Sequence, residues 1–248
     1  MGGKPQAPDK PGRKRGGPLY AQVRQLLRER IRSGAWRPGQ LLPNEFEIAD
    51  QFGVSQGTAR KALDALAQDG LVVRRQGRGT FVVEHTPAHV MFRFFHLYEN
   101  GGAQILPGSR NIKIKVGRAT DAERTTLLLA RGANVIRISR IRTHGDKPFI
   151  VETITLPEAL FPGLAEGSHV PNTLYDLFQK TFGILVVRAD ERISAIAASP
   201  GEARALGVPK GAPLLKIDRV GFGLDETPVE WRVSAVHLDK AHYFSRLK

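Results

Sequence analysis

The chain has 248 residues, of which 41% are hydrophobic and 25% charged, close to globular averages, so the composition excludes wholesale disorder and fibrous repeats. Its 37 Lys and Arg residues outnumber 24 Asp and Glu residues, giving a formal net charge of +13. Cysteine is absent, which excludes disulfides, thiolate metal sites and thiol nucleophiles. No stretch approaches the roughly 18 consecutive apolar residues of a spanning helix, and the basic N-terminus lacks the apolar region of a signal peptide. We therefore expect a cytoplasmic protein.

The positive charge is concentrated in the first third of the chain. Residues 1–80 contain 15 basic and 7 acidic residues, a net charge of +8. This clustering predicts a polyanionic partner, most commonly a nucleic acid backbone, and a solubilising surface charge is the alternative. Residues 1–17 are mostly Gly, Pro, Lys and Arg with almost no apolar content, which predicts a disordered basic arm.

Two helices are predicted after this arm. Apolar side chains at helical spacing predict a first helix that begins after Pro18 and ends before the stop signal Gly34. A second, short helix is predicted by Asn44 and by Glu47 three residues later, which together form a capping box. The apolar residues of the first helix are Leu19, Val23, Leu26, Leu27 and Ile31, and those expected to be buried in the second are Phe46 or Ile48, Ala49 and Phe52.

A third helix is predicted to begin at the N-cap residue Ser55 and to end at Gly70. The tight corner Gly53-Val54 separates it from the second helix, an arrangement typical of a helix-turn-helix. Residues 71–83 form two strand-like runs around a Gly-rich, Arg-rich tip and predict a β-hairpin. Three helices and a hairpin together predict a winged helix-turn-helix. Its third helix is expected to bury Ala59, Ala62, Leu63 and Leu66.

The domain boundaries can be placed from these patterns. We assign the winged helix-turn-helix domain to 18–84, a linker to 85–90 and a second domain to 91–248. In the second domain strand-like runs outnumber helical ones and their spacings suit hairpins, so we predict an α+β fold with an antiparallel sheet. Strands are expected at 91–98, 112–118, 135–142, 148–156, 184–196, 213–222 and 228–237, and helices near 121–131, 173–182 and 200–206.

The start of the third helix and the hairpin tip are the candidate DNA-binding elements. Side chains at the N-terminus of a recognition helix enter the major groove, where Gln can pair with adenine and Arg with guanine or a phosphate. Glycine at the hairpin tip permits close approach to the minor groove, whose negative potential suits a neighbouring arginine. The alternatives are a simple helix cap at Ser55, a solvated Arg60 and an ordinary hairpin turn. The candidate residues are Ser55, Gln56, Gly57, Thr58, Arg60, Lys61, Arg75, Gln76, Gly77 and Arg78.

Two arginines end one predicted strand of the second domain. In a continuous strand, Arg140 and Arg142 share a face with isoleucines, and Glu152 takes a similar position in the next strand. Charges on an apolar face are costly unless they are paired or presented to an anion, and two such arginines can hold one phosphate or carboxylate. The pattern alone favours the structural alternative, an Arg–Glu cluster at a sheet edge. Tyr175 likewise has a core alternative, at helical spacing with Phe178.

Several runs carry a resemblance to a known family. In the first domain they are Pro18-Leu19-Tyr20, Phe52-Gly53-Val54-Ser55, Gly70-Leu71-Val72 and the specific run Arg75-Gln76-Gly77-Arg78-Gly79-Thr80-Phe81-Val82. In the second domain they are Phe182-Gly183-Ile184, Leu206-Gly207-Val208 and Pro228-Val229-Glu230. Over about residues 18–248 the chain resembles the GntR family of bacterial transcription regulators, in particular its HutC branch, which has a UTRA effector domain.

The resemblance implies a dimeric regulator whose second domain has a chorismate-lyase-like fold and binds a small effector. It also reverses the preference for a purely structural Arg–Glu cluster, because family members place effector contacts at the matching positions. The effector-binding residues that it implies are Arg140, Arg142, Glu152, Thr173, Tyr175 and Glu230.

The chain departs from the family pattern at three places. Phe46 stands where an arginine is common, and the start of the recognition helix is Ser55-Gln56-Gly57-Thr58 in place of Ser-Arg-Thr-Thr. The final strand has Val236-His237-Leu238 where an aromatic residue often lines the effector pocket. The operator sequence and the effector therefore cannot be carried over from the family.

We predict a transcription regulator rather than an enzyme, and a repressor whose repression the effector relieves. The expected partners are a second copy of the chain, a roughly palindromic double-stranded operator DNA and a small anionic metabolite, either a sugar phosphate or a carboxylate. No cofactor or metal is expected, because no histidine pair has metal-binding spacing. Two alternatives stay open: a chorismate-lyase-like enzyme fused to a DNA-binding head, and a basic architectural DNA-binding protein without an effector.

Overall fold

Two separate units make up the chain. The residues that the computed structural model describes are 17–86, 94–167 and 170–245. Backbone packing divides the chain between Glu84 and His85. Of the predicted arm at 1–17 only Gly17 is described, and of the predicted linker at 85–90 only His85 and Thr86.

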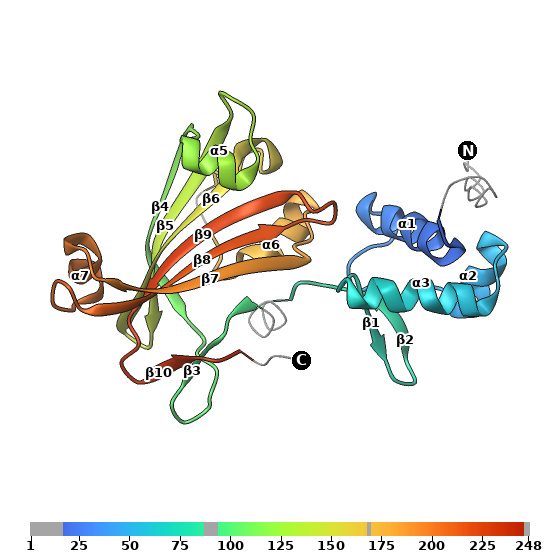
Figure 1. Ribbon diagram of the computed structural model, residues 1–248, viewed down its shortest axis with the longest axis horizontal. Helices are drawn as coiled ribbons and strands as arrows, with labels where there is room; N and C mark the ends of the chain where they lie inside the picture. Colours follow the sequence, from blue (N-terminus) through green and yellow to red (C-terminus); the bar gives the residue numbers. More distant parts are fainter. Residues whose placement is uncertain (1–16, 87–93, 168–169, 246–248) are drawn as a thin grey trace. The chain divides into compact units, whose positions relative to one another are not determined.

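The first unit has three helices and a hairpin, as predicted (Figure 1). Leu41 forms an isolated antiparallel bridge with Phe81, so the second strand of the hairpin is paired on both sides near its middle. The hairpin is therefore packed against the segment that precedes the second helix. The elements are α1 (Leu19–Arg32), α2 (Glu45–Phe52), α3 (Gln56–Gln68), β1 (Val72–Arg75) and β2 (Gly79–Val82).

The predicted caps of α2 and α3 are confirmed. Asn44 accepts hydrogen bonds from the backbone N–H groups of Phe46 and Glu47, at 2.9 and 3.0 Å, and the Glu47 carboxylate accepts the Asn44 N–H at 2.7 Å. Gly53 ends α2 in the left-handed conformation, with φ +63°, which costs glycine little. Ser55 then caps α3 by accepting the Thr58 N–H at 3.2 Å. These caps fix the corner between the two helices.

Burial in α2 resolves the alternative between Phe46 and Ile48. Ile48 is fully buried, whereas the side chain of Phe46 is 68% exposed. Phe52, on the same face as Ile48, is 2% exposed and lies under the guanidinium of Arg30, which is 4.9 Å from the ring centre. Phe46 is therefore a surface residue of the helix that precedes the recognition helix.

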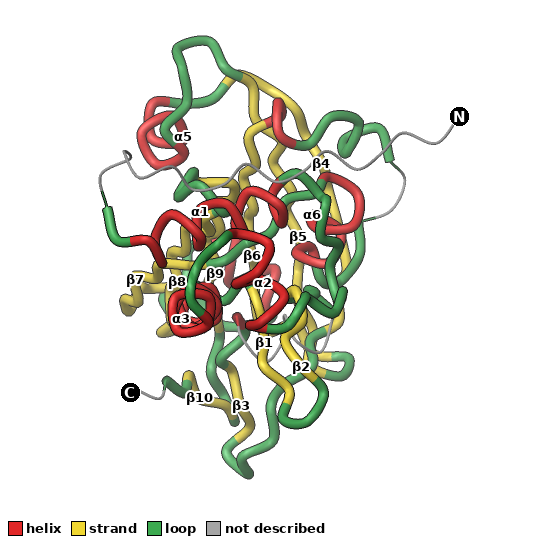
Figure 2. Tube along the Cα trace, turned by 90° about the vertical axis from the view of Figure 1, so that its right-hand side faces the viewer, coloured by secondary structure: helices red, strands yellow, loops and turns green. Residues whose placement is uncertain are grey.

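The second unit is built on an antiparallel six-stranded sheet with the strand order β4-β5-β6-β9-β8-β7. A separate pair of short strands, β3 and β10, lies side by side in Figures 1 and 2. The predicted α+β class is correct. The strands are β3 (Leu97–Glu99), β4 (Gly108–Arg118), β5 (Asn134–His144), β6 (Lys147–Pro157), β7 (Arg188–Ala197), β8 (Pro213–Phe222), β9 (Pro228–Val236) and β10 (Ala241–Tyr243), and the helices are α5 (Asp121–Leu127), the 3-10 turn η1 (Glu158–Leu160), α6 (Leu174–Phe182) and α7 (Pro200–Leu206).

Three predicted elements need correction. The strand expected at 91–98 begins only at Leu97, and residues 91–93 lie outside the described part of the chain. The strand expected at 184–196 begins at Arg188. The helix expected to reach residue 131 ends at Leu127, because Leu128 adopts a left-handed conformation with φ +53°. The strand β10 was not predicted.

The inner face of the sheet carries two apolar clusters at opposite ends. One packs against α6 and includes Ile138, Ile154 and Phe178. The other packs against the β3–β10 pair and includes Ile150 and Val236. Because strand side chains alternate between faces, every second residue between these clusters on the same strands also points inward. This central part of the inner face is polar.

Replacing Phe52 by alanine tests the core of the first unit. Because the ring is almost fully buried, we expect Phe52→Ala to lower the free energy of unfolding by about 3–5 kcal/mol. Phe46→Ala is the matched control in the same helix, and its exposed ring predicts a change within about 0.5 kcal/mol. Denaturant unfolding of the full chain, followed by circular dichroism, measures both. Equal losses would contradict the burial pattern.

Candidate effector pocket and DNA-reading surface

A band of charged side chains crosses the inner face of the sheet between the two apolar clusters. The strand register places Arg140 opposite Glu152, and Glu152 opposite Ser234. It also places Arg232 opposite Arg219, and Arg219 opposite Glu191. We call this set the polar band, and its members are Arg140, Arg142, Glu152, Glu191, Arg219, Glu230, Arg232 and Ser234.

Arg140 and Glu152 form the central ion pair of the polar band. Their side chains are 1% and 4% exposed, and Arg140 Nε donates to Glu152 Oε1. Arg140 Nη1 also donates to the carbonyl of Asn172 at 3.3 Å. Burial by itself would raise the pKa of Glu152, but the charges of Arg140, Arg232 and Arg142 outweigh burial and hold that pKa well below its usual range. Glu152 is therefore an anion surrounded by cations.

Arg142 is the least compensated cation of the band. Its Nη1 donates to the carbonyl of Asn172 at 3.0 Å and lies 3.6 Å from Glu152 Oε1. Among the described residues its buried Nε has no hydrogen-bond partner. Burial lowers the pKa of Arg142 to about 9, which still leaves the guanidinium charged at neutral pH. A buried charge of this kind favours a bound anion.

Arg219 links the band to the segment before β3. Its Nε donates to Glu191 Oε1 at 2.6 Å, and its Nη2 donates to the carbonyl of Phe94. The hydroxyl of Tyr243, in β10, donates to the other oxygen of Glu191. The β3–β10 pair and the segment at Phe94 are thus held to the sheet through one arginine and one carboxylate.

Arg232 lies near the second carboxylate oxygen of Glu152, the one that Arg140 does not bind. Its Nε donates to Glu230 Oε1, and its Nη1 is 3.9 Å from Glu152 Oε2. Its guanidinium is 5.7 Å from the ring centre of Tyr175. Burial, followed by the nearby charge of Glu230, raises the pKa of Tyr175, so the phenol stays protonated. A Cβ at Gly221 would lie 3.1 Å from Tyr175 Oη, and glycine there allows the phenol to approach β8.

Two small cavities of about 30 Å³ each open onto the band. Arg142, Arg219 and Arg232 line both cavities, and so does Phe95. Thr173, at the start of α6, lines one of them and Glu152 the other. Each cavity has room for about one or two water molecules. A metabolite needs a larger space than either cavity offers, and Phe95 lines both of them.

All six residues predicted for the effector site lie in or beside the polar band. The pair Arg140–Glu152 is on interior strands, not at the sheet edge that the structural alternative assumed. Sequence reasoning missed four members of the band: Glu191, Arg219, Arg232 and Ser234. A usable signal was present, because inward positions alternate through Ile217, Arg219 and Gly221 in β8 and through Glu230, Arg232, Ser234 and Val236 in β9.

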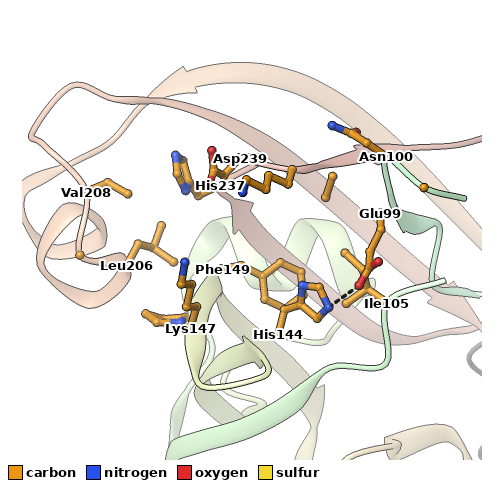
Figure 3. Close-up of a pocket in the computed structure, with 15 residues that line it drawn as sticks. Glu99, Asn100, Ile105, His144, Lys147, Phe149, Leu206, Val208, His237 and Asp239 are labelled. Atoms are coloured by element: carbon orange, nitrogen blue, oxygen red, sulfur yellow. Dashed lines mark ion pairs between the residues drawn. The ribbon is translucent and has the colours of Figure 1, made fainter. Parts of the chain in front are cut away.

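A larger open cavity of about 990 Å³ lies between α7, the β5–β6 turn and the β3–β10 pair (Figure 3). Glu99 and His144 form an ion pair of 2.8 Å on one wall, and His237 and Asp239 lie near each other on another. None of the predicted effector residues lines it. Two lysines and two carboxylates give this cavity no preference for one sign of charge.

The candidate recognition helix presents its first turn to solvent. Ser55 Oγ is 2.9 Å from Thr58 Oγ1, and Gly57 is exposed, where an added Cβ would lie 4.0 Å from Ser55 Oγ. Arg60 Nε donates to Glu45 Oε2 at 2.8 Å, and Gln56 Nε2 donates to the same oxygen at 3.4 Å. Two further exposed cations, Lys61 and Arg75, lie over aromatic rings, those of Tyr20 and Phe81, at 4.4 and 4.8 Å from the ring centres.

The hairpin tip is exposed over residues 75–79. The Arg78 N–H donates to the carbonyl of Arg75 at 2.9 Å, and Gly77 takes the left-handed conformation with φ +67°. At Gly79, φ is +102° and a Cβ would lie 2.7 Å from Leu41 Cδ1. A side chain at residue 79 would therefore disturb the contact between Leu41 and the tip end of β2. Gln76 and Arg78 remain available at the tip.

Within the described ranges, no group of three or more His, Asp and Glu side chains could hold a metal ion. The part of the chain that the structure describes also contains no helix long and apolar enough to cross a membrane.

The two units define a class of protein: a winged helix-turn-helix head joined to an α+β domain with a buried band of charged side chains. The model of the gntR family of bacterial regulatory proteins matches residues 19–82, and the UTRA domain model matches residues 103–242. The chain therefore belongs to the GntR family, in its HutC branch, and is a transcription regulator with a UTRA effector domain.

The alignments with known regulators cover most of both chains. The chain is 32% identical to the transcriptional repressor NagR of Bacillus subtilis, an alignment that covers 93% of this chain and 96% of NagR. It is 30% identical to the histidine utilization repressor of Pseudomonas aeruginosa, over 82% and 80% of the two chains. The crystal structure of PhnF from Mycobacterium smegmatis matches with a TM-score of 0.55 and 27% identity, over 91% of this chain and 99% of PhnF. These relationships favour a regulator over the enzyme alternative.

Glu152→Gln tests the central ion pair. The neutral amide leaves the guanidiniums of Arg140 and Arg142 buried without their carboxylate, so we expect a loss of about 3–5 kcal/mol in the free energy of unfolding. Because the folded-state pKa of Glu152 is lowered, the difference from the unchanged protein should be full at neutral pH and shrink as acid protonates Glu152. Glu166→Gln, at an exposed position, is the control. A pH-independent difference would contradict the ion pair.

Proposed function

We propose that the protein is a homodimeric, cytoplasmic repressor that releases operator DNA when a small anionic metabolite binds at the polar band. The observation that carries the proposal is the charge balance of the band. Arg140, Arg142, Arg219 and Arg232 face the three carboxylates Glu152, Glu191 and Glu230. One guanidinium is in excess, and the unsatisfied Arg142 Nε marks where an anion would bind.

The small size of the two cavities suggests how the effector acts. An anion on Arg219 competes with the carbonyl of Phe94 for the same guanidinium, and a metabolite has to displace Phe95 to enter. Both residues come shortly after the boundary between the two units. Effector binding therefore favours a different arrangement of this segment, and a coupling of about 1–3 kcal/mol is enough to change operator affinity.

On the DNA side we assign reading of the major groove to Gln56, Thr58 and Arg60 and contact with the minor groove to the hairpin tip. Ser55, Lys61 and Arg75 supply phosphate contacts, which position the helix without reading sequence. A two-fold symmetric dimer would place two such heads on a roughly palindromic operator. The excess of basic residues in the first 80 positions supports the polyanion partner.

An effector test uses thermal unfolding of the full chain with four probes: inorganic phosphate, glucose 6-phosphate, D-glycerate and uncharged glucose. We expect at least one anion to raise Tm in a concentration-dependent way and glucose to leave it unchanged. Arg142→Ala should abolish the shift. The matched control Arg192→Ala removes an exposed arginine from β7 and should keep it. Equal shifts with glucose, or a full shift in Arg142→Ala, would count against the anion site.

Operator binding is measured by fluorescence anisotropy on DNA from upstream of the protein's own gene, with random DNA as competitor at near-physiological salt. A specific regulator should prefer one fragment by more than about a thousandfold. If the upstream fragment fails, a genome-wide pull-down supplies the fragment to be tested. Equal affinity for all fragments would support the architectural alternative instead.

A further inference from the structure

Glu45, the first residue of α2, joins three elements of the DNA-binding unit. Its Oε2 accepts Arg60 Nε at 2.8 Å and Gln56 Nε2 at 3.4 Å, both from α3. Its Oε1 accepts Arg74 Nη1, from β1, at 3.1 Å. The Glu45 side chain is only 16% exposed. One carboxylate thus contacts both of the long polar side chains assigned to major-groove reading, together with strand β1 of the hairpin.

The carboxylate of Glu45 is held in its ionised form. Burial by itself would raise the pKa of Glu45, but the hydrogen bonds from Arg60 and Arg74 outweigh it and lower the pKa below its usual range. Glu45 therefore stays ionised at neutral pH. Charge-assisted hydrogen bonds of this kind are shorter and about twice as strong as neutral ones, so they can hold an otherwise flexible arginine.

The contact with Arg60 occupies one edge of its guanidinium only. Nε is used, whereas the structure gives Nη1 and Nη2 no partner within the described residues, and the side chain is 58% exposed. An arginine reads guanine O6 and N7 with two donors presented side by side. With Nε fixed on Glu45, the Nη1–Nη2 edge is the one left to face DNA.

We propose that Glu45 is a positioning residue for DNA reading, which orients the guanidinium of Arg60 and the amide of Gln56 for base contacts without touching DNA itself. This inference rests on the proposed function, because it requires these two side chains to read bases. The carboxylate repels the phosphate backbone, so it increases sequence discrimination at a cost in overall affinity.

A purely structural role for Glu45 predicts a different outcome. Arg74 has a second carboxylate partner, Asp64 on α3, at 2.7 Å, so the contact between α3 and β1 of the hairpin survives the loss of Glu45. Asp64 is also the matched control. Asp64 binds Arg74, as Glu45 does, and carries the same charge as Glu45. Among the described residues it makes no hydrogen bond with Arg60 or Gln56.

The experiment compares Glu45→Ala, Glu45→Gln and Asp64→Asn in the full chain, by anisotropy on selected and random DNA of equal length. We expect Glu45→Ala to weaken binding to selected DNA about tenfold, as for loss of one bidentate base contact, while binding to random DNA stays equal or becomes tighter. Glu45→Gln should lie between Glu45→Ala and the unchanged protein. Asp64→Asn should keep the ratio of the two affinities. Circular dichroism and Tm confirm folding of each variant.

Selection from a randomised DNA library separates failure of this inference from failure of the proposed function. The unchanged protein should enrich a consensus containing a guanine whose replacement is penalised, and Glu45→Ala and Arg60→Ala should lose discrimination at that same position. Adding Arg60→Ala to Glu45→Ala should cause no further loss, because the two act as a unit. The same consensus from Glu45→Ala overturns the positioning role alone. No consensus from the unchanged protein overturns both proposals.

Discussion

The ion pair between Arg140 and Glu152 is the constraint on which the second unit depends. It lies between two apolar clusters on the inner face of the sheet, where a lone charge would be very costly. Each cation added beside it therefore needs a carboxylate, a carbonyl or a ligand. Glu152, Glu191, Glu230 and the carbonyl of Asn172 supply most of these partners. The remaining deficit at Arg142 is the observation on which the proposed anion site rests.

The first unit depends on a different kind of constraint, the closure of helix ends. Asn44 and Ser55 cap α2 and α3, and Gly53 turns the chain between them. These bonds bring the start of α2 next to the start of α3, which is why Glu45 can reach Gln56 and Arg60. The Phe46 ring, which no core contact requires, is left exposed on the same short helix.

Local patterns determined how much of this could be predicted from the sequence. Caps, glycine stops and alternation in β5 and β6 are local, so the helices of the head, the α+β class and the inward direction of Arg140 and Arg142 could be predicted. The partners of these arginines are not local. Arg219 meets Glu191 only because β7 and β8 pair, and its contact with Phe94 spans 125 positions. The contact of Arg232 with Glu152 and those of Glu45 with α3 likewise depend on tertiary pairing that no spacing rule indicates.

Both units use a carboxylate to orient arginine, and the degree of burial determines the effect of that contact in each. At the polar band the carboxylate and the cations are desolvated together, so an incoming anion meets guanidiniums that are already fixed and loses little by ordering them. At Glu45 the bound arginine is exposed, so its hydrogen bond restricts geometry more than it changes the local charge. Lysine could not replace Arg60, because one ammonium group cannot bind a carboxylate and also present a planar pair of donors. In the two proposals, the same residue type captures a ligand in one unit and reads bases in the other.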